Sequence, residues 1–93
     1  MTMCTIRVEL HDAGWVDYTN LSTYLRNNNI TDVIVTDTGK RYKMSPGHYT
    51  YNGPKTFDQV YDEAVSCAAR VGKRYAVTAS HVTANKWVGL SPA

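Results

Sequence analysis

A histidine and an aspartate, His11 and Asp12, stand side by side where a strand-like segment of the chain ends. A carboxylate at a strand end can bind Mg²⁺, which takes oxygen ligands, and a neighbouring imidazole can move a proton during phosphodiester hydrolysis. The pair is therefore a candidate catalytic site, with Asp12 as the candidate metal ligand. The alternative is structural: Asp12 caps a turn and His11 lies on the open face of a sheet. One carboxylate does not make a metal site, and the sequence points to no second ligand.

Basic residues offer a route to the same chemistry without a metal. An arginine or lysine can stabilise the negative charge that builds up on phosphorus when a ribose 2′-hydroxyl attacks it. Candidates for this catalytic role are Arg7, Arg41 and Lys43. The predicted RNA-binding residues are Arg7, Lys40, Arg41, Lys43, Lys73 and Arg74. The alternative is that the basic clusters are solvated turns, since a net charge of +2 is too small to indicate nucleic-acid binding by itself.

A strand and a helix come first among the elements that would position these residues. Residues 4–10 alternate between aliphatic and polar side chains, which is typical of a strand with one buried face. Asp17 is a good N-cap, and apolar residues follow it at helical spacing. Three asparagines at residues 27–29 end the helix, because asparagine tolerates left-handed geometry.

The middle of the chain alternates strands and turns. Residues 30–36 and 41–44 flank an Asp-Thr-Gly-Lys turn, and this pattern predicts a hairpin. A Ser-Pro-Gly sequence at residues 45–47 interrupts the second strand. Residues 48–51 resume an extended pattern, and an Asn-Gly-Pro sequence turns the chain again.

The last third of the chain opens with the clearest helix signal. Thr56 and Gln59 form a capping box, the apolar spacing continues to residue 71, and Gly72 is a suitable C′ residue. The elements predicted after it are a strand at residues 75–82, a turn at residues 83–85 and a short strand at residues 86–90.

This order of elements contains two split βαβ units and predicts an α+β fold. We expect a ferredoxin-like βαββαβ sandwich: an antiparallel sheet with two helices on one face and a short extra C-terminal strand. The 93 residues are enough for a single domain, residues 1–93, with one modest core. The predicted core consists of Ile6, Val8, Leu10, Leu21, Leu25, Ile34, Val60, Ala64, Ala68 and Val77.

The composition indicates a folded, soluble protein, because 43% of the residues are hydrophobic and only 19% are charged. No apolar run approaches the roughly 18 residues that span a bilayer, and the N-terminus lacks the pattern of a signal peptide. We therefore expect a cytoplasmic protein with no membrane partner. Cys4 and Cys67 fit this compartment as two buried thiols, with one disulfide between them as the alternative.

Aromatic residues are numerous for this length, and RNA bases stack on such rings. The outward face of residues 4–10 has none, which argues against the sheet-stacking mode of RNA-recognition motifs. Tyr49 and Tyr51 could stack on bases, and packing at the edge of an element is the other interpretation. His48 and His81 are isolated and are interpreted as surface or core-edge residues.

An apolar patch near the C-terminus consists of Trp87, Val88 and Leu90. Exposed patches and free sheet edges tend to be covered by a partner, so we expect a homodimer with this patch as its interface. The alternative is that Trp87 folds back on its own sheet.

Three segments carry a resemblance to a known family: VELHDAGWVDYTNL, TFDQVYDEAVSCAARVGKRYAVTASHV and KWVGL. They contain an HDA-type strand exit, a DY-x-x-L helix start, a late alanine-rich helix followed by K-x-Y-x-V, and a terminal W-x-x-L. The chain resembles the GhoS-type endoribonuclease antitoxins, small bacterial and phage proteins of type V toxin–antitoxin systems. The resemblance implies a ferredoxin-like fold and cleavage of the mRNA of a toxin, but it supplies no catalytic motif that transfers residue by residue.

Two functions stay open. The first is an RNA-binding, antitoxin-like protein that acts on single-stranded mRNA as an endoribonuclease; it needs no cofactor unless Asp12 binds Mg²⁺. The second is a non-catalytic phage or bacterial module that binds and inhibits a host or defence protein on the same fold. For the second function, the acidic side chains of Asp58, Asp62 and Glu63 would suit a basic protein partner.

Overall fold

The computed structural model describes residues 1–84 and 86–93. Its elements in chain order are β1 (Thr2–Leu10), α1 (Trp15–Arg26), β2 (Val33–Val35), β3 (Arg41–Lys43), β4 (His48–Gly53), α2 (Phe57–Val71) and β5 (Tyr75–His81). Within these residues, β1 is the centre of a three-stranded antiparallel sheet with the order β4-β1-β5, and β2 and β3 form a separate two-stranded sheet.

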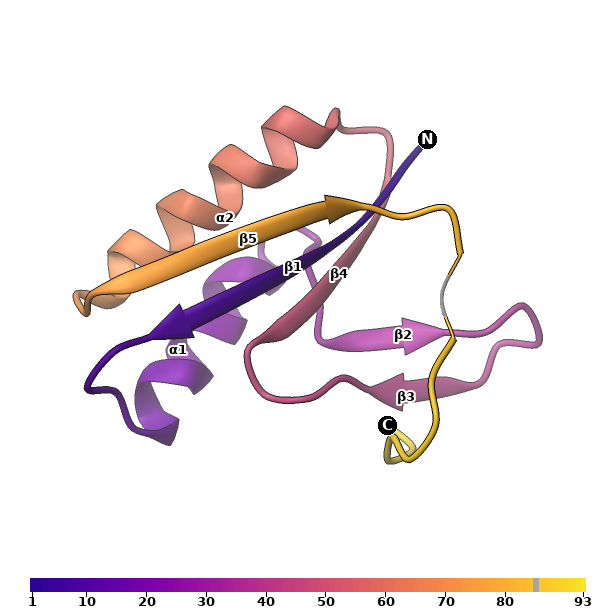
Figure 1. Cartoon of the computed structure of the whole chain (residues 1–93), viewed down its shortest axis with the longest axis horizontal. Helices are drawn as coiled ribbons and strands as arrows, with labels where there is room; N and C mark the ends of the chain where they lie inside the picture. The colour runs from indigo at the N-terminus through magenta and orange to yellow at the C-terminus, as the bar shows by residue number, and fades with distance from the viewer. Residues whose placement is uncertain (85) are drawn as a thin grey trace.

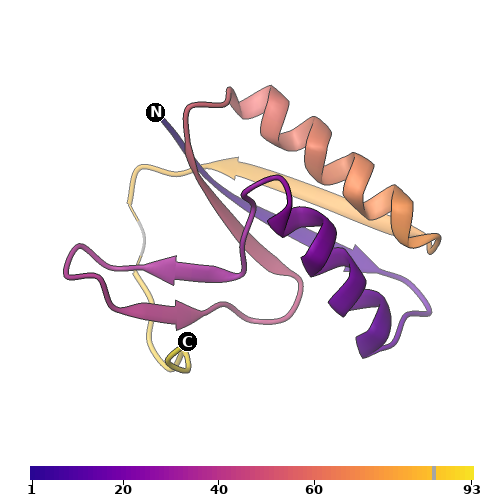
Figure 2. The same ribbon diagram turned by 180° about the vertical axis from the view of Figure 1, so that it is seen from behind.

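Both helices cover the same face of the three-stranded sheet, which lies in front of them in Figure 1 and behind them in Figure 2. This layering, with β1 between β4 and β5, confirms the ferredoxin-like α+β prediction. The other face of the sheet carries no helix, and we call it the open face. Among the described residues, no helix has both the length and the apolar content needed to cross a bilayer.

The core lies between the sheet and the two helices. Leu21 and Leu25 of α1 are fully buried against the aliphatic face of β1 and the small residues of α2. Eight of the ten predicted core residues belong to this core, and Val77 is partly buried against it. Ile34 is buried on β2, outside the core cluster. The buried hydrophobic residues that were not predicted as core are Cys4, Ile30, Tyr49, Tyr51 and Cys67. Both cysteines are free, as expected.

The start of α1 differs from the prediction. Gly14, not Asp17, is the N-cap. The helix therefore begins at Trp15, three residues before the start that an N-cap at Asp17 predicts. The Asp17 carboxylate instead accepts a hydrogen bond from the Gly14 amide at 3.1 Å. An acidic residue is favourable anywhere in the first turn, so its presence does not locate the cap to a single residue.

The start and end of α2 follow the prediction. The Gln59 amide donates to Thr56 Oγ1 at 3.2 Å, and the Thr56 amide donates to Gln59 Oε1 at 2.9 Å. At the other end, Gly72 adopts the left-handed conformation with φ of 87°. These are local signals, and local hydrogen bonds satisfy them.

The predicted hairpin forms but leaves the main sheet. Thr31 pairs with Thr50 of β4 through two backbone hydrogen bonds of 2.9 and 2.7 Å, and the chain then turns away. β2 and β3 form a two-stranded hairpin that projects beside the sheet (Figure 1), and we call this hairpin the arm. On the side of β1 away from β5, the pairing strand is β4, which in the sequence is only an extended segment after the Ser-Pro-Gly interruption.

The predicted strand at residues 86–90 does not form. The chain bends at Val88 and Gly89, where Gly89 has a φ of 83°. The segment after it runs beside β3 instead, with the Lys43 amide donating to the Ser91 carbonyl at 2.9 Å and the Ala93 amide donating to the Arg41 carbonyl at 3.0 Å. Part of the predicted turn at residues 83–85 lies outside the described residues, because it includes Asn85.

Candidate functional site

Rows of polar side chains cross the open face. Because side chains alternate along a strand and the aliphatic residues of β1 face the helices, Arg7 lies on the open face. His48 of β4 and Thr78 of β5 are its partners on either side. The next row consists of Thr50, Thr5 and Ser80. The face is therefore a hydrogen-bonding surface rather than a platform of aromatic rings.

Arg7 and His48 form the centre of this surface. Arg7 is exposed, and within the described part of the chain it makes no ion pair. The side chain of His48 is partly buried, and its Nδ1 has no hydrogen-bond partner among the described residues. Buried nitrogens without a partner cost free energy and are uncommon. A guanidinium that can bind a phosphate thus lies beside an imidazole that can accept or donate a proton.

Gly47 sets this pairing. Its carbonyl accepts a hydrogen bond from the Val8 amide at 2.8 Å, immediately before β4 begins. Gly47 is buried with a φ of 81°, and a Cβ atom at this position would lie 2.8 Å from the Val8 carbonyl oxygen. Only glycine tolerates both the conformation and the close approach. The Ser-Pro-Gly interruption thus has a structural purpose, which is to bring His48 into register with Arg7.

His11 and Asp12 lie at one end of the sheet. The His11 amide donates to the Arg74 carbonyl at 2.8 Å, so the end of β1 meets the turn that contains Lys73 and Arg74. Asp12 is exposed, and its backbone adopts the left-handed conformation with a φ of 53°. This geometry is that of a strand exit into a turn. Two of the predicted basic residues nevertheless lie close to the candidate pair.

Arg41 lies far from that pair. The end of β1 and the start of β3 stand at opposite ends of the molecule in Figure 1. The predicted catalytic residues His11, Asp12 and Arg41 are therefore not brought into one site. The residues that the structure describes also contain no group of three or more histidine, cysteine, aspartate or glutamate side chains that could hold a metal ion.

The basic residues of the arm face the helix side of the molecule. Tyr42 contacts Trp87 with ring centroids 5.8 Å apart, and strand alternation points its neighbours Arg41 and Lys43 the other way. Lys43 lies 3.9 Å from Asp32 and lines a groove of about 440 Å³ beside α1. We call it the α1 groove; its lining includes Trp15, which is 77% exposed, and Arg26. Lys40 lies exposed in the turn of the arm.

The predicted RNA-binding residues thus divide among three places. Arg7 lies on the open face, the three basic residues of the arm lie at one end of the molecule, and Lys73 and Arg74 lie at the other. A single short RNA segment would not contact all of them at once. On the open face, the predicted residue Arg7 lies beside His48, which was not among the predicted site residues.

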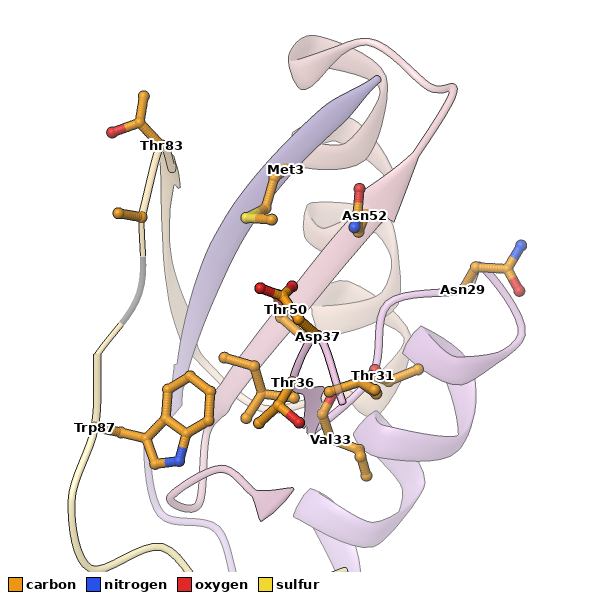
Figure 3. Close-up of a pocket in the computed structure, with 13 residues that line it drawn as sticks. Met3, Asn29, Thr31, Val33, Thr36, Asp37, Thr50, Asn52, Thr83 and Trp87 are labelled. Carbon is orange, nitrogen blue, oxygen red and sulfur yellow. Dashed lines mark hydrogen bonds between the residues drawn. The ribbon is translucent and has the colours of Figure 1, made fainter. Parts of the chain in front are cut away.

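A second groove, of about 600 Å³, lies where the open face meets the arm (Figure 3), and we call it the arm groove. Thr50 and Asn52 of β4 line one side, and Trp87 points into it from the C-terminal segment. Among the described lining residues, only Asp37 carries a charge. The groove therefore suits an uncharged group that can both stack and form hydrogen bonds, and its lining residue Thr50 also belongs to the row next to Arg7.

The tyrosines next to His48 cannot stack on bases. Tyr49 and Tyr51 are 1% and 2% exposed, because alternation along β4 turns them toward the helices. The Tyr49 hydroxyl lies 2.8 Å from Ser22 Oγ, and burial raises the pKa of Tyr49 above its usual value. The packing interpretation of these tyrosines is correct, and the same alternation places His48 on the open face.

His48 is the residue that sequence reasoning passed over. An isolated histidine gives no local signal, and its pairing with Arg7 spans 41 positions of the chain. The Pro-Gly pair just before it is the one available hint, since a glycine there permits a close approach of two backbones. No protein-family model matches the chain, and no curated protein matches it significantly.

Proposed function

We propose that this protein binds single-stranded RNA on its open face, as an antitoxin-like protein of the kind that the three segments resemble. The observation that carries the proposal is the cross-strand pair of Arg7 and His48, set among the hydroxyl groups of Thr5, Thr50 and Ser80. Arginine binds phosphate oxygens with two parallel hydrogen bonds, and hydroxyl groups bind phosphate and ribose.

The arm groove supports the same proposal. Met3 and Arg7 are four residues apart on one face of β1, about 13 Å along the strand, so a nucleotide chain can contact Arg7 and reach the groove. A base that enters the groove can stack on Trp87 and form hydrogen bonds with Asn52 or Asp37. The phosphate would then stay outside, near the arginine, and away from Asp37.

The finer part of the proposal is that RNA is cleaved without a metal. His48 would take the proton of the ribose 2′-hydroxyl, the 2′-oxygen would attack the adjacent phosphorus, and Arg7 would stabilise the charge that develops there. The 5′-oxygen leaves and takes a proton from water, and His48 returns its proton to solvent, so the products carry a 2′,3′-cyclic phosphate and a 5′-hydroxyl. The catalytic roles thus go to His48 and Arg7 instead of His11, Asp12 and Arg41, because Arg41 lies far from His11 and Asp12.

The test combines binding and cleavage on one labelled pool of single-stranded RNA. Arg7→Gln should weaken binding about tenfold, because it removes a charge-assisted contact. His48→Gln should leave binding nearly unchanged and slow cleavage by roughly 10²-fold to 10⁴-fold, the usual contribution of a general base. Glu9→Gln removes the acidic neighbour of Arg7 on the same face and should strengthen binding.

The control is Arg26→Gln, which removes an exposed positive charge from α1 on the helix side. It should change neither binding nor cleavage. If Arg26→Gln weakens binding and Arg7→Gln does not, the RNA binds in the α1 groove and the open-face proposal fails. If no RNA is bound or cut, the non-catalytic protein-binding function takes its place, and the exposed Asp58 and Asp62 become the first residues to vary.

A further inference from the structure

The outer edge of β5 is open. β5 pairs with β1 along one side, and no strand among the described residues pairs with its other side (Figure 1). β5 is seven residues long, whereas the opposite edge strand, β4, is partly covered by Thr31. The sheet therefore has one long edge that can accept another strand.

The backbone groups that are available at this edge follow from two hydrogen bonds. The Val82 amide donates to the Met3 carbonyl, and the Arg74 carbonyl accepts from the His11 amide, so even-numbered residues point toward β1. Alternation then turns the amides and carbonyls of the odd-numbered residues outward. The outward residues are Tyr75, Val77, Ala79 and His81.

None of the usual devices protects this edge. Natural edge strands avoid pairing through lysines, prolines, bulges or inward-pointing charges. The β5 sequence, YAVTASH, contains no lysine, arginine, aspartate, glutamate or proline. An unprotected edge of this length is a template for a further antiparallel strand.

The flank of α2 above this edge is partly apolar. Glu63 binds Lys55 at 2.8 Å and Arg70 lies 4.2 Å from the Tyr24 ring, so these residues mark the side of α2 that faces α1. Tyr61 and Val65 lie about half a turn away from Glu63, on the side of β5. Tyr61 is 40% exposed, and so is Tyr75 at the start of β5.

The charges along α2 and β5 suit a two-fold arrangement. Asp58 lies at the start of α2 near the end of β5, because Phe57 contacts His81 with ring centroids 5.5 Å apart. Lys73 and Arg74 come just before the start of β5. When two β5 strands run antiparallel, the basic end of one copy lies beside the acidic end of the other.

We propose that two copies of this chain associate through their β5 edges, with antiparallel pairing about a two-fold axis at Thr78. The two sheets then form one continuous sheet, and all four outward residues of each β5 take part in hydrogen-bonded pairs. Thr78 faces the partner's Thr78 on the open face. On the helix face, Val77 faces the partner's Ala79 and Tyr75 faces the partner's His81.

This interface differs from the one expected from the sequence. Trp87 contacts Tyr42 of its own chain, and Val88 is 96% exposed without belonging to the edge of either sheet. The two interfaces can therefore be distinguished by single lysine substitutions at exposed positions. Thr78 is exposed on β5, and Val88 is exposed in the C-terminal segment.

The test is sedimentation of the wild-type protein and three variants at micromolar concentration. The wild type should sediment at twice the 10.4 kDa mass of the chain. Thr78→Lys and Thr78→Glu should each weaken association at least about tenfold, because like charges would face each other across the axis. An equimolar mixture of the two variants should form the dimer again, whereas Val88→Lys should stay dimeric.

Two results would overturn the proposal. The first is a wild type that sediments only as a 10.4 kDa species. The second is dissociation by Val88→Lys with no effect of Thr78→Lys, which would assign the interface to the C-terminal patch. Neither measurement involves RNA, so the dimer can fail this test while the proposed RNA function holds, and the reverse is also true.

Discussion

Arg7 of β1 and His48 of β4 are direct cross-strand partners, although 41 positions separate them in the chain. Their side chains share the open face because both strands turn their buried residues toward the helices. The backbone of Gly47, which is bound to Val8 at 2.8 Å, maintains this register. The close backbone contact at Gly47 thus continues the β1–β4 pairing beyond Arg7 and His48.

Gly47→Ala should destabilise the protein by about 1–3 kcal/mol, because it forces a side chain into a left-handed position and against the Val8 carbonyl. Urea unfolding followed by circular dichroism measures this change. Gly39→Ala is the matched control, since its φ of 86° is also left-handed but a Cβ atom there meets no atom within 4 Å. Equal stability of the two variants would mean that the contact at Gly47 does not hold the register.

The salt dependence of RNA binding reports how many phosphates are contacted and by which residues. Each phosphate contact on a single strand contributes roughly −0.7 to the slope of log K against log salt concentration. Arg7→Gln should make the slope shallower by about that amount. The triple variant with alanine at Lys40, Arg41 and Lys43 should leave the slope unchanged, because Arg41 and Lys43 face the helix side. A shallower slope in this triple variant would mean that RNA binds to the arm.

Asp12→Asn tests the metal hypothesis without disturbing the turn. Asparagine tolerates the left-handed conformation that Asp12 adopts, with a φ of 53°, so the fold should be unchanged. We expect RNA cleavage to persist in this variant and in the presence of EDTA. If both treatments abolish cleavage while binding survives, Asp12 is a metal ligand and the metal-free mechanism is wrong.

Leu21→Ala should cost roughly 2–5 kcal/mol of stability, because Leu21 is fully buried between α1 and the sheet. Asn20→Ala, one position earlier and exposed, should change the stability by less than about 0.5 kcal/mol. Both values come from urea unfolding at neutral pH. A small effect of Leu21→Ala would contradict a single core shared by the helices and the sheet.

Stability should fall at alkaline pH. Burial raises the pKa of the Cys4 and Cys67 thiols above the ordinary value of 9.0, and burial likewise raises the pKa of the Tyr49 hydroxyl. The unfolded chain loses these protons first, so the stabilisation is complete below pH 9.0 and is lost as the pH rises above it. The urea midpoint should therefore stay level up to pH 9.0 and drop as the pH rises above that value. In Cys67→Ala this drop should be smaller.

Local sequence determined the elements whose hydrogen bonds are local. The alternation of β1, the Thr56 and Gln59 capping box and the Gly72 helix end all appear where the sequence predicted them, because neighbouring residues satisfy them. The hairpin of residues 33–43 is also a local product, since its turn and its strands are contiguous.

Tertiary structure decided which of these elements pair with which. Nothing local required that the hairpin should leave the sheet after Thr31, or that β4 should take its place beside β1. A strand's face and partner depend on the packing of distant residues, and a shift of one residue would turn its side chains to the other face. For that reason the sequence determined that Arg7 faces away from the core, whereas only the folded sheet set His48 beside it.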